Sequence, residues 1–144
     1  MMKLNEVICG DALEVLKSMP SEYVDCVVTS PPFWSLRDYG VNGQLGLEKD
    51  FNEYVDKLVI IFDEVKRVLK KSGTCFVNLG DTYSTVSGSM GTDGKYREPK
   101  WDNATLAKNI KQPRTNLPNK CLCGIPYRFT LQMVDRGWTW RNHI

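Results

Sequence analysis

The chain has 144 residues, of which 42% are hydrophobic and 25% are charged, a composition typical of one globular domain with a core of its own. No apolar run approaches the roughly 20 residues of a membrane-spanning helix, and the start lacks a signal-peptide core, so we expect a cytoplasmic protein with no membrane partner. The cysteine count is odd, and the only close pair, Cys121 and Cys123, is spaced too tightly for a zinc knuckle. We therefore expect no disulfide framework and no metal site.

The net charge of +2 conceals an uneven distribution of charge. Residues 1–93 hold 9 Lys and Arg against 14 Asp and Glu, whereas residues 94–120 hold 7 against 2. A basic segment of this kind predicts either contact with a polyanion or a solvated, lysine-rich loop. Charge alone favours neither interpretation.

The first third of the chain predicts a strand at 6–9, a helix at 12–17 and a strand at 24–28. Asp11 can cap the helix, which is its simplest role. A strand, a helix and a second strand form a βαβ unit, in which parallel strands place their carboxyl ends at one edge where ligands bind. We expect Asp11 and Ser30 to lie together at this edge.

The second of these strands ends sharply at Thr29-Ser30-Pro31-Pro32-Phe33. Proline has no N–H for a strand ladder, and each proline holds the residue before it in an extended conformation. A stiff Ser30 hydroxyl, the Pro31 carbonyl and the Phe33 ring form a pocket suited to a planar ring that carries an amino group. A plain strand-to-loop turn is the alternative interpretation.

After the corner, the sequence predicts a flexible loop that forms one wall of the pocket. A long amphipathic helix at 51–71 that covers the sheet and a strand at 74–79 are expected to follow it. Asp81, directly after that strand, either lines the same edge or stabilises a turn. A helix at 125–135 and a strand at 138–144 close the chain.

Residues 82–119 show no clear periodicity, which in a compact domain indicates a functional loop or disorder. Here and just beyond, cations alternate with aromatic residues, a mixture that suits phosphate contacts and stacking on bases. The cations that we expect to contact DNA are Lys95, Arg97, Lys100, Arg114 and Lys120.

Ser30 to Phe33 resembles the catalytic motif of the amino-group DNA methyltransferases, which is Asp, Asn or Ser, then Pro-Pro, then an aromatic residue. The segment Lys120 to Phe129 resembles the one that follows the long loop in the subgroup whose catalytic motif precedes the donor-binding glycine motif. The resemblance covers the chain from Val7 to Ile144. It implies an α/β, Rossmann-like methyltransferase fold with a mostly parallel sheet and flanking helices.

That glycine motif, Phe-x-Gly-x-Gly, does not occur in this sequence. The resemblance therefore implies that 1–144 is the front part of a catalytic domain, incomplete at its C-terminus, with 82–119 inserted as a long basic loop. Activity of this chain alone is an open question at this point.

The resemblance also implies roles for individual residues and an identity for the cofactor. The cofactor is S-adenosylmethionine, held near Asp11, Ala12, Thr29 and Ser30, and the catalytic residues are Ser30, Pro31, Pro32 and Phe33. The substrate is a base flipped out of double-stranded DNA, with cytosine N4 favoured over adenine N6 because the motif begins with serine. A second copy of the chain and a restriction endonuclease are further possible partners.

Two other classes of protein remain open from the sequence. The chain could be a catalytically inactive DNA-binding fragment, or a methyltransferase that acts on a protein or a small molecule. A Rossmann dehydrogenase is disfavoured, because the first turn contains no Gly-x-Gly-x-x-Gly.

Overall fold

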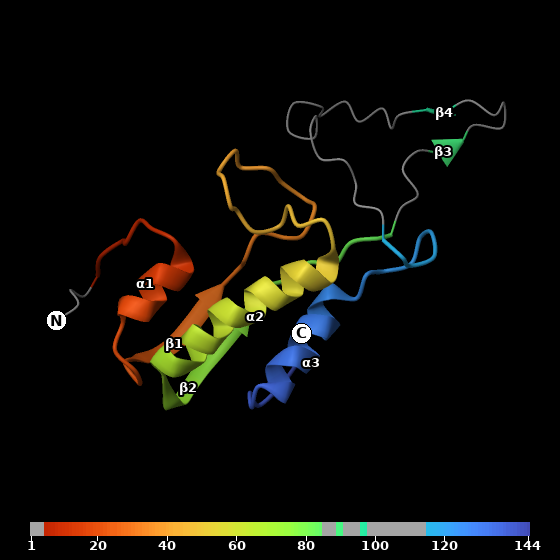
Figure 1. Cartoon of the computed structure of the whole chain (residues 1–144). Helices are drawn as coiled ribbons and strands as arrows, with labels where there is room; N and C mark the ends of the chain where they lie inside the picture. Colours follow the sequence, from red (N-terminus) through yellow and green to blue (C-terminus); the bar gives the residue numbers. More distant parts are fainter. Residues whose placement is uncertain (1–4, 85–88, 91–95, 98–114) are drawn as a thin grey trace.

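A computed structural model of the chain describes residues 5–84, 89–90, 96–97 and 115–144, and for 89–90 and 96–97 it describes the backbone alone (Figure 1). In chain order the elements are α1 (Ala12–Ser18), β1 (Val24–Thr29), α2 (Phe51–Val68), β2 (Leu69–Val77), β3 (Ser89–Met90), β4 (Tyr96–Arg97) and α3 (Ile125–Asp135).

The centre of the fold is a parallel pair of strands, β1 and β2, joined by α2 as the crossover helix. Val27 pairs with Cys75 and Thr29 with Val77, so the two strands end side by side. The Asn78 N–H donates to the Thr29 carbonyl at 2.9 Å, which ties these ends together. An edge of parallel carboxyl ends therefore exists, but β1 and β2 form it, and not the predicted pair of strands at 6–9 and 24–28.

The helices cover one face of this sheet, with α2 packed between α1 and α3 (Figure 1). The apolar side of α2 supplies most of the buried core, including Tyr54, Leu58 and Phe62. Phe62 meets Phe129 of α3 edge to face, with ring centroids 4.9 Å apart. Because burial of such a side chain contributes about 1.5–3 kcal/mol, this contact fixes α3 beside α2.

The opposite face of the sheet is open among the described residues. Val28 and Phe76, neighbours in the β1–β2 register, are 77% and 55% exposed. Cys26, on the same strand as Val28, is also exposed. All five cysteines are free thiols.

Two predicted strands are wrong. Residues 6–9 form no strand in the described chain, and Val7 is fully exposed. Residues 138–144 form no strand either, and instead His143 packs edge-on against Tyr127 of α3. An alternating pattern indicates which residues could share a face, but a strand also needs a neighbour for its backbone hydrogen bonds, and the described chain offers none to these segments.

The boundary between α2 and β2 also differs from the prediction. The helix ends at Val68 rather than at residue 71, and Leu69 already pairs with Val24 of β1. The register then shifts before Thr74, so residues 70–73 form an irregular stretch. A Cβ on Gly73 would lie 2.9 Å from the Lys70 carbonyl oxygen, which explains why glycine occupies this close approach.

The base of the predicted 82–119 loop lies within the described residues. Tyr83 forms a bridge with Leu122, and the Ser84 hydroxyl lies 2.5 Å from the Thr115 hydroxyl. β3 and β4 pair as a short antiparallel ribbon inside this region. Among the helices described, none has the length and apolar character that a bilayer crossing requires.

Candidate active site

The Ser-Pro-Pro-Phe corner begins directly after β1. Ser30 is exposed, and within the described part of the chain its hydroxyl has no hydrogen-bond partner. Pro31, Pro32 and Phe33 are each half-buried. The corner therefore exposes the Ser30 hydroxyl at the carboxyl edge of the sheet, while its other three residues are partly buried against the rest of the protein.

Tyr54 holds this corner from the core. Its hydroxyl donates a 2.6 Å hydrogen bond to the Pro32 carbonyl oxygen, and its completely buried side chain projects from the first turn of α2. Burial raises the pKa of Tyr54 far above its ordinary value, and the nearby Glu48 carboxylate raises it further. The hydroxyl thus remains a proton donor to Pro32 at any physiological pH.

Trp34 anchors the chain that leaves the corner. It is 2% exposed, its Nε1 donates to the Glu48 carbonyl at 2.9 Å, and its ring packs edge-on against Phe51 at 5.7 Å. The Ser35 N–H donates to the Gly46 carbonyl at 2.7 Å. Trp34 is thus a buried anchor at the start of the loop that the sequence predicted to be a flexible wall of the pocket.

Glu48 is a buried carboxylate behind the corner. Its Oε2 accepts a 2.8 Å hydrogen bond from the Gly46 N–H, and Lys57 Nζ lies 3.3 Å from Oε1 in an ion pair. A buried charge is tolerated when it is paired and hydrogen-bonded. Through these two contacts, Glu48 connects the loop that contains Gly46 to Lys57 of α2.

Phe33 lies against the backbone that follows β2. A Cβ built on Gly80 would be 2.6 Å from Phe33 Cδ2, so the ring occupies the space that any side chain at position 80 would need. Gly46 is approached in the same way, with its Cβ position 2.9 Å from the Phe33 carbonyl oxygen. The two glycines set the position of Phe33 at the edge where β1 and β2 end.

The predicted cofactor residues fall into two groups. Thr29 and Ser30 lie at the end of β1, whereas Asp11 and Ala12 are exposed at the start of α1. Asp11 Oδ1 accepts a 3.1 Å hydrogen bond from the Glu14 N–H, which makes Asp11 the N-cap of that helix. Since 6–9 is not a strand, Asp11 does not follow a strand of the sheet.

Asp81 caps the start of α3, a role that neither of its two expected interpretations included. Its Oδ2 accepts from the Gly124 N–H at 3.0 Å, and its Oδ1 accepts from the Ile125 N–H at 3.1 Å. N–H groups at the start of a helix have no acceptor within the helix, so Asp81 supplies the acceptors that these two groups need. Asp81 therefore secures the return of the chain after the long loop.

Of the predicted DNA-binding cations, Lys95, Lys100 and Arg114 lie outside the described residues. The backbone of Arg97 is in β4, paired with Ser89. Lys120 is exposed, with a left-handed backbone (φ 66°), at the base of the long loop.

The sequence model of the DNA methylase family matches residues 24–144, which include the Ser-Pro-Pro-Phe corner. The chain belongs to this family. No solved structure matches it significantly. The two-stranded parallel sheet with its helices is accordingly an incomplete Rossmann-like methyltransferase fold.

Relatives of this DNA methylase chain include the Type II methyltransferases M.Cfr9I of Citrobacter freundii (45% identical) and M.XycI of Xanthomonas campestris pv. cyanopsidis (47% identical). Each match covers 94% of this chain and 43% of the relative. M.SmaI of Serratia marcescens is 40% identical over 96% of this chain and 46% of its own length. The chain thus spans less than half the length of these relatives, and the match covers their N-terminal portion.

Tyr54, Glu48 and Gly80 were missed as parts of this DNA methylase corner. Tyr54 occurs on the apolar face of the long predicted helix, where a hydroxyl among aliphatic positions is the one available signal of a polar partner. Gly80 follows a strand and reads as an ordinary turn residue. Neither sequence pattern predicts the contact of Tyr54 with Pro32 or of Gly80 with Phe33, because each contact joins segments that are far apart in the sequence.

Proposed function

We propose that the chain is the catalytic-motif portion of a DNA methyltransferase that transfers the methyl group of S-adenosylmethionine to an exocyclic amino group. The observation that carries the proposal is the corner itself. An exposed Ser30, whose hydroxyl has no partner among the described residues, sits on a proline-stiffened turn that Tyr54 holds from the core. The relatives' name, Type II methyltransferase, supports the same reaction class.

In this proposal the target base is flipped out of the duplex, because an amino nitrogen inside a base pair cannot be reached. Phe33, seated on Gly80, provides a flat face for the extruded ring. Ser30 Oγ and the Pro31 carbonyl oxygen accept hydrogen bonds from the two amino protons. These two acceptors draw the nitrogen lone pair out of conjugation with the ring and orient it for attack.

The rate acceleration in this scheme comes mainly from positioning. Ser30 and the Pro31 carbonyl would hold the amino nitrogen in line with the methyl group that bound S-adenosylmethionine would supply from its sulfonium, and the amino group would lose one proton after the transfer. Serine is a poor general base, so this proton passes to water. Ser30 acts as an orienting acceptor, and the corner must be rigid for that role.

S-adenosylmethionine supplies the electrophilic methyl group when bound. The residues of this chain fit one part of it: Thr29 and Ser30 lie at the carboxyl edge, and Asp11 uses only Oδ1 in its cap, which leaves Oδ2 as an acceptor among the described residues. Ala12, beside Asp11, is exposed as well. The glycine motif that the resemblance assigns to the methionine end is absent from this sequence.

Cytosine N4 is the target that we favour over adenine N6. The support is the serine at position 30, since members of the resembled family with Ser-Pro-Pro lean toward cytosine. We further propose that the cations of the long loop contact DNA phosphates, that the cytoplasm is the site of action, and that a restriction endonuclease is the functional partner. A homodimer is a further assembly that the resemblance allows.

The test is a methyl-transfer assay on genomic DNA with nucleoside analysis of the product. The chain is assayed alone and together with the part of M.Cfr9I that follows the matched region. We expect N4-methylcytosine from the combined sample. N6-methyladenine would overturn the base assignment, and methylation of added protein without methylated DNA would overturn the DNA substrate.

Binding to DNA can be tested on the chain alone. Substitution Lys120→Gln removes one exposed cation and should reduce the slope of log affinity against log salt by about 0.9 for duplex DNA. Lys17→Gln is the matched control, because Lys17 is ion-paired with Glu14 on α1 at 2.8 Å. Equal slopes for Lys120→Gln and the unmodified chain would remove Lys120 from the interface.

An inactive DNA-binding fragment remains the second candidate, favoured by the missing glycine motif. Calorimetry with S-adenosylmethionine separates the two. Binding by the combined sample supports the enzyme, whereas salt-sensitive DNA binding with no donor binding in that sample supports the fragment.

A further inference from the structure

The loop that leaves the Ser-Pro-Pro-Phe corner, residues 35–46, returns to the corner through Gly46. The Ser35 N–H donates to the Gly46 carbonyl at 2.7 Å, and this bond closes the loop at its two ends. The Phe33 carbonyl accepts a 3.3 Å hydrogen bond from the Leu36 N–H, and a Cβ on Gly46 would lie 2.9 Å from the same oxygen. Gly46 is therefore packed directly against the backbone of the corner.

The close approach of Gly46 requires a glycine. Its φ is 95°, in the left-handed region, and the Phe33 carbonyl occupies the space that a side chain would need. Because glycine has no side chain to anchor it, the approach depends on the backbone groups of Gly46. Its carbonyl bonds to Ser35, and its N–H donates to Glu48 Oε2 at 2.8 Å.

Glu48 contacts the chain on both sides of this approach. Besides the bond from Gly46 to its carboxylate, its carbonyl oxygen accepts a 2.9 Å hydrogen bond from Nε1 of Trp34, the residue that follows Phe33. The side chain of Glu48 is 1% exposed. Since a hydrogen bond to a carboxylate is about twice as strong as one to a neutral acceptor, the Gly46 N–H is held firmly.

The buried charge of Glu48 is compensated only in part. Lys57 Nζ lies 3.3 Å from Oε1, yet this oxygen accepts no hydrogen bond from any residue that the structure describes. Lys57 is 49% exposed and also pairs with Glu53 at 3.0 Å. A buried carboxylate paired in this way contributes little to stability, so a role in fixing geometry explains it better.

We propose that the Glu48 carboxylate is a positioning residue for methyl transfer: through Gly46 it sets the place of Phe33, on which the flipped base lies. This inference rests on the proposed function for the reaction that the corner performs. Glu48 touches neither the base nor the methyl donor. A catalytic geometry must be held to within about 0.5 Å, and Glu48 supplies this precision at the Phe33 carbonyl, as Tyr54 does at the Pro32 carbonyl.

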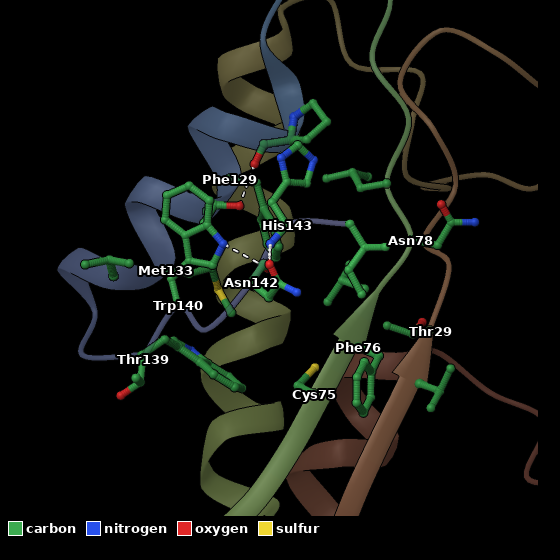
Figure 2. Close-up of a pocket in the computed structure, with 18 residues that line it drawn as sticks. Thr29, Cys75, Phe76, Asn78, Phe129, Met133, Thr139, Trp140, Asn142 and His143 are labelled. Atoms are coloured by element: carbon green, nitrogen blue, oxygen red, sulfur yellow. Dashed lines mark hydrogen bonds between the residues drawn. The ribbon is translucent and has the colours of Figure 1, made fainter.

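The cavity drawn in Figure 2 provides an internal reference for the test. It holds about 460 Å³ between β2, α3 and residues 138–144, and its lining includes neither the loop at 35–46 nor Glu48. Asn78 lines this cavity, and its N–H donates to the Thr29 carbonyl at the end of β1. A change that is confined to the loop should therefore leave the exchange of the Asn78 amide unaltered.

Backbone amide exchange on the 144-residue chain tests the proposal without any methyl transfer. Glu48→Ala removes the acceptor of the Gly46 N–H. We expect the amides of Ser35 and Leu36, which do not bond to Glu48, to exchange at least about fivefold faster, with Asn78 within about twofold. Unchanged exchange at Ser35 and Leu36 would overturn the proposal. Glu48→Gln, which keeps the shape and one acceptor oxygen, replaces Glu48→Ala if the latter does not fold.

Kinetics in the combined sample separate positioning from stability. Glu48→Ala should lower kcat at least about tenfold and change the KM for DNA less than about twofold, because a displaced Phe33 still meets DNA but holds the base out of line. Glu48→Gln should lower kcat less. If Glu48 served stability alone, kcat per folded molecule would stay the same, and that result would overturn the proposal.

Glu53→Gln is the matched control for these changes. It removes the other carboxylate that pairs with Lys57, which is 51% exposed and lies one turn away on the same helix. We expect kcat and the exchange of the Ser35 amide to stay within about twofold of the unmodified chain. Equal losses for Glu53→Gln and Glu48→Gln would overturn the proposal, because the charge near Lys57 would then matter rather than the bond to Gly46.

The two proposals fail in different ways. Faster exchange at Ser35 and Leu36 in a chain whose combined sample does not methylate DNA contradicts the proposed function and leaves the hold of Glu48 on the corner standing. Methylation of DNA that Glu48→Ala leaves undiminished contradicts the positioning role alone.

Discussion

The Tyr54 hydroxyl donates a 2.6 Å hydrogen bond to the Pro32 carbonyl oxygen, and this bond joins the first turn of α2 to the corner that follows β1. Contacts of Phe33 and Trp34 and the Ser35–Gly46 hydrogen bond also hold this corner. Since the proposed chemistry depends on the position of Ser30 and the Pro31 carbonyl, Tyr54 acts as a positioning residue.

Removal of this hydroxyl should loosen the corner. Tyr54→Phe keeps the ring in the core and deletes the donor, so we expect a loss of about 1 kcal/mol in the free energy of unfolding, measured in urea. In the methyl-transfer assay kcat should fall more than KM rises, because a mobile corner still binds DNA but orients the amino group poorly. Tyr39→Phe, at an exposed loop residue, should change neither quantity.

The same hydroxyl predicts a dependence of stability on pH. Burial raises the pKa of Tyr54 above its ordinary value of 10. Above pH 10 the unfolded chain therefore releases this proton while the folded chain retains it, and the free energy of unfolding falls as the pH rises. We expect the stability advantage of the unmodified chain over Tyr54→Phe to shrink between pH 9.5 and 11, a range set by that ordinary value. A constant difference across this range would contradict the account.

Gly80 should be sensitive to any added side chain. A Cβ there meets the Phe33 ring at 2.6 Å, so Gly80→Ala must displace the ring, at a cost of about 1–3 kcal/mol. Phe33→Ala opens that space, and Gly80→Ala should then cost much less. A double-mutant cycle by urea denaturation measures this coupling, and additive effects would show that the two residues are not in contact.

Asp81 should matter for stability rather than for chemistry. Asp81→Ala removes the acceptor for the Gly124 and Ile125 N–H groups and should cost about 1–2 kcal/mol in thermal or urea unfolding. Asp135→Ala, at the exposed end of α3, is the control and should be neutral within about 0.5 kcal/mol. Equal losses would argue against the cap.

The sequence predicted the elements whose cause is local. The spacing of Tyr54, Leu58 and Phe62 marks the buried side of a long helix, and that helix is α2. The β-branched run that two prolines cut off is β1. Pro126, near the start of α3, and Gly137, after its end, fit the observed helix bounds closely.

The errors concern contacts between distant segments. Residues 6–9 and 138–144 have strand-like patterns, yet whether they pair depends on neighbours that the pattern does not name. The same holds for the corner: Ser30 to Phe33 can be found by eye, whereas Tyr54 behind Pro32 and Gly80 beneath Phe33 emerge only from the fold. The motif could be recognised because its residues are consecutive in the sequence. Tyr54 and Gly80, which support it, could not be recognised because they are distant from it in the sequence.

The most direct measurement compares methyl transfer and donor affinity for Ser30→Ala in the combined sample, with Ser72→Ala as the control at an exposed serine of β2. The account predicts that Ser30→Ala lowers kcat by at least about a hundredfold, with S-adenosylmethionine affinity within about twofold and Ser72→Ala unchanged in both. Undiminished turnover by Ser30→Ala would contradict the account, because the proline-stiffened corner could not then be the group that holds the amino nitrogen.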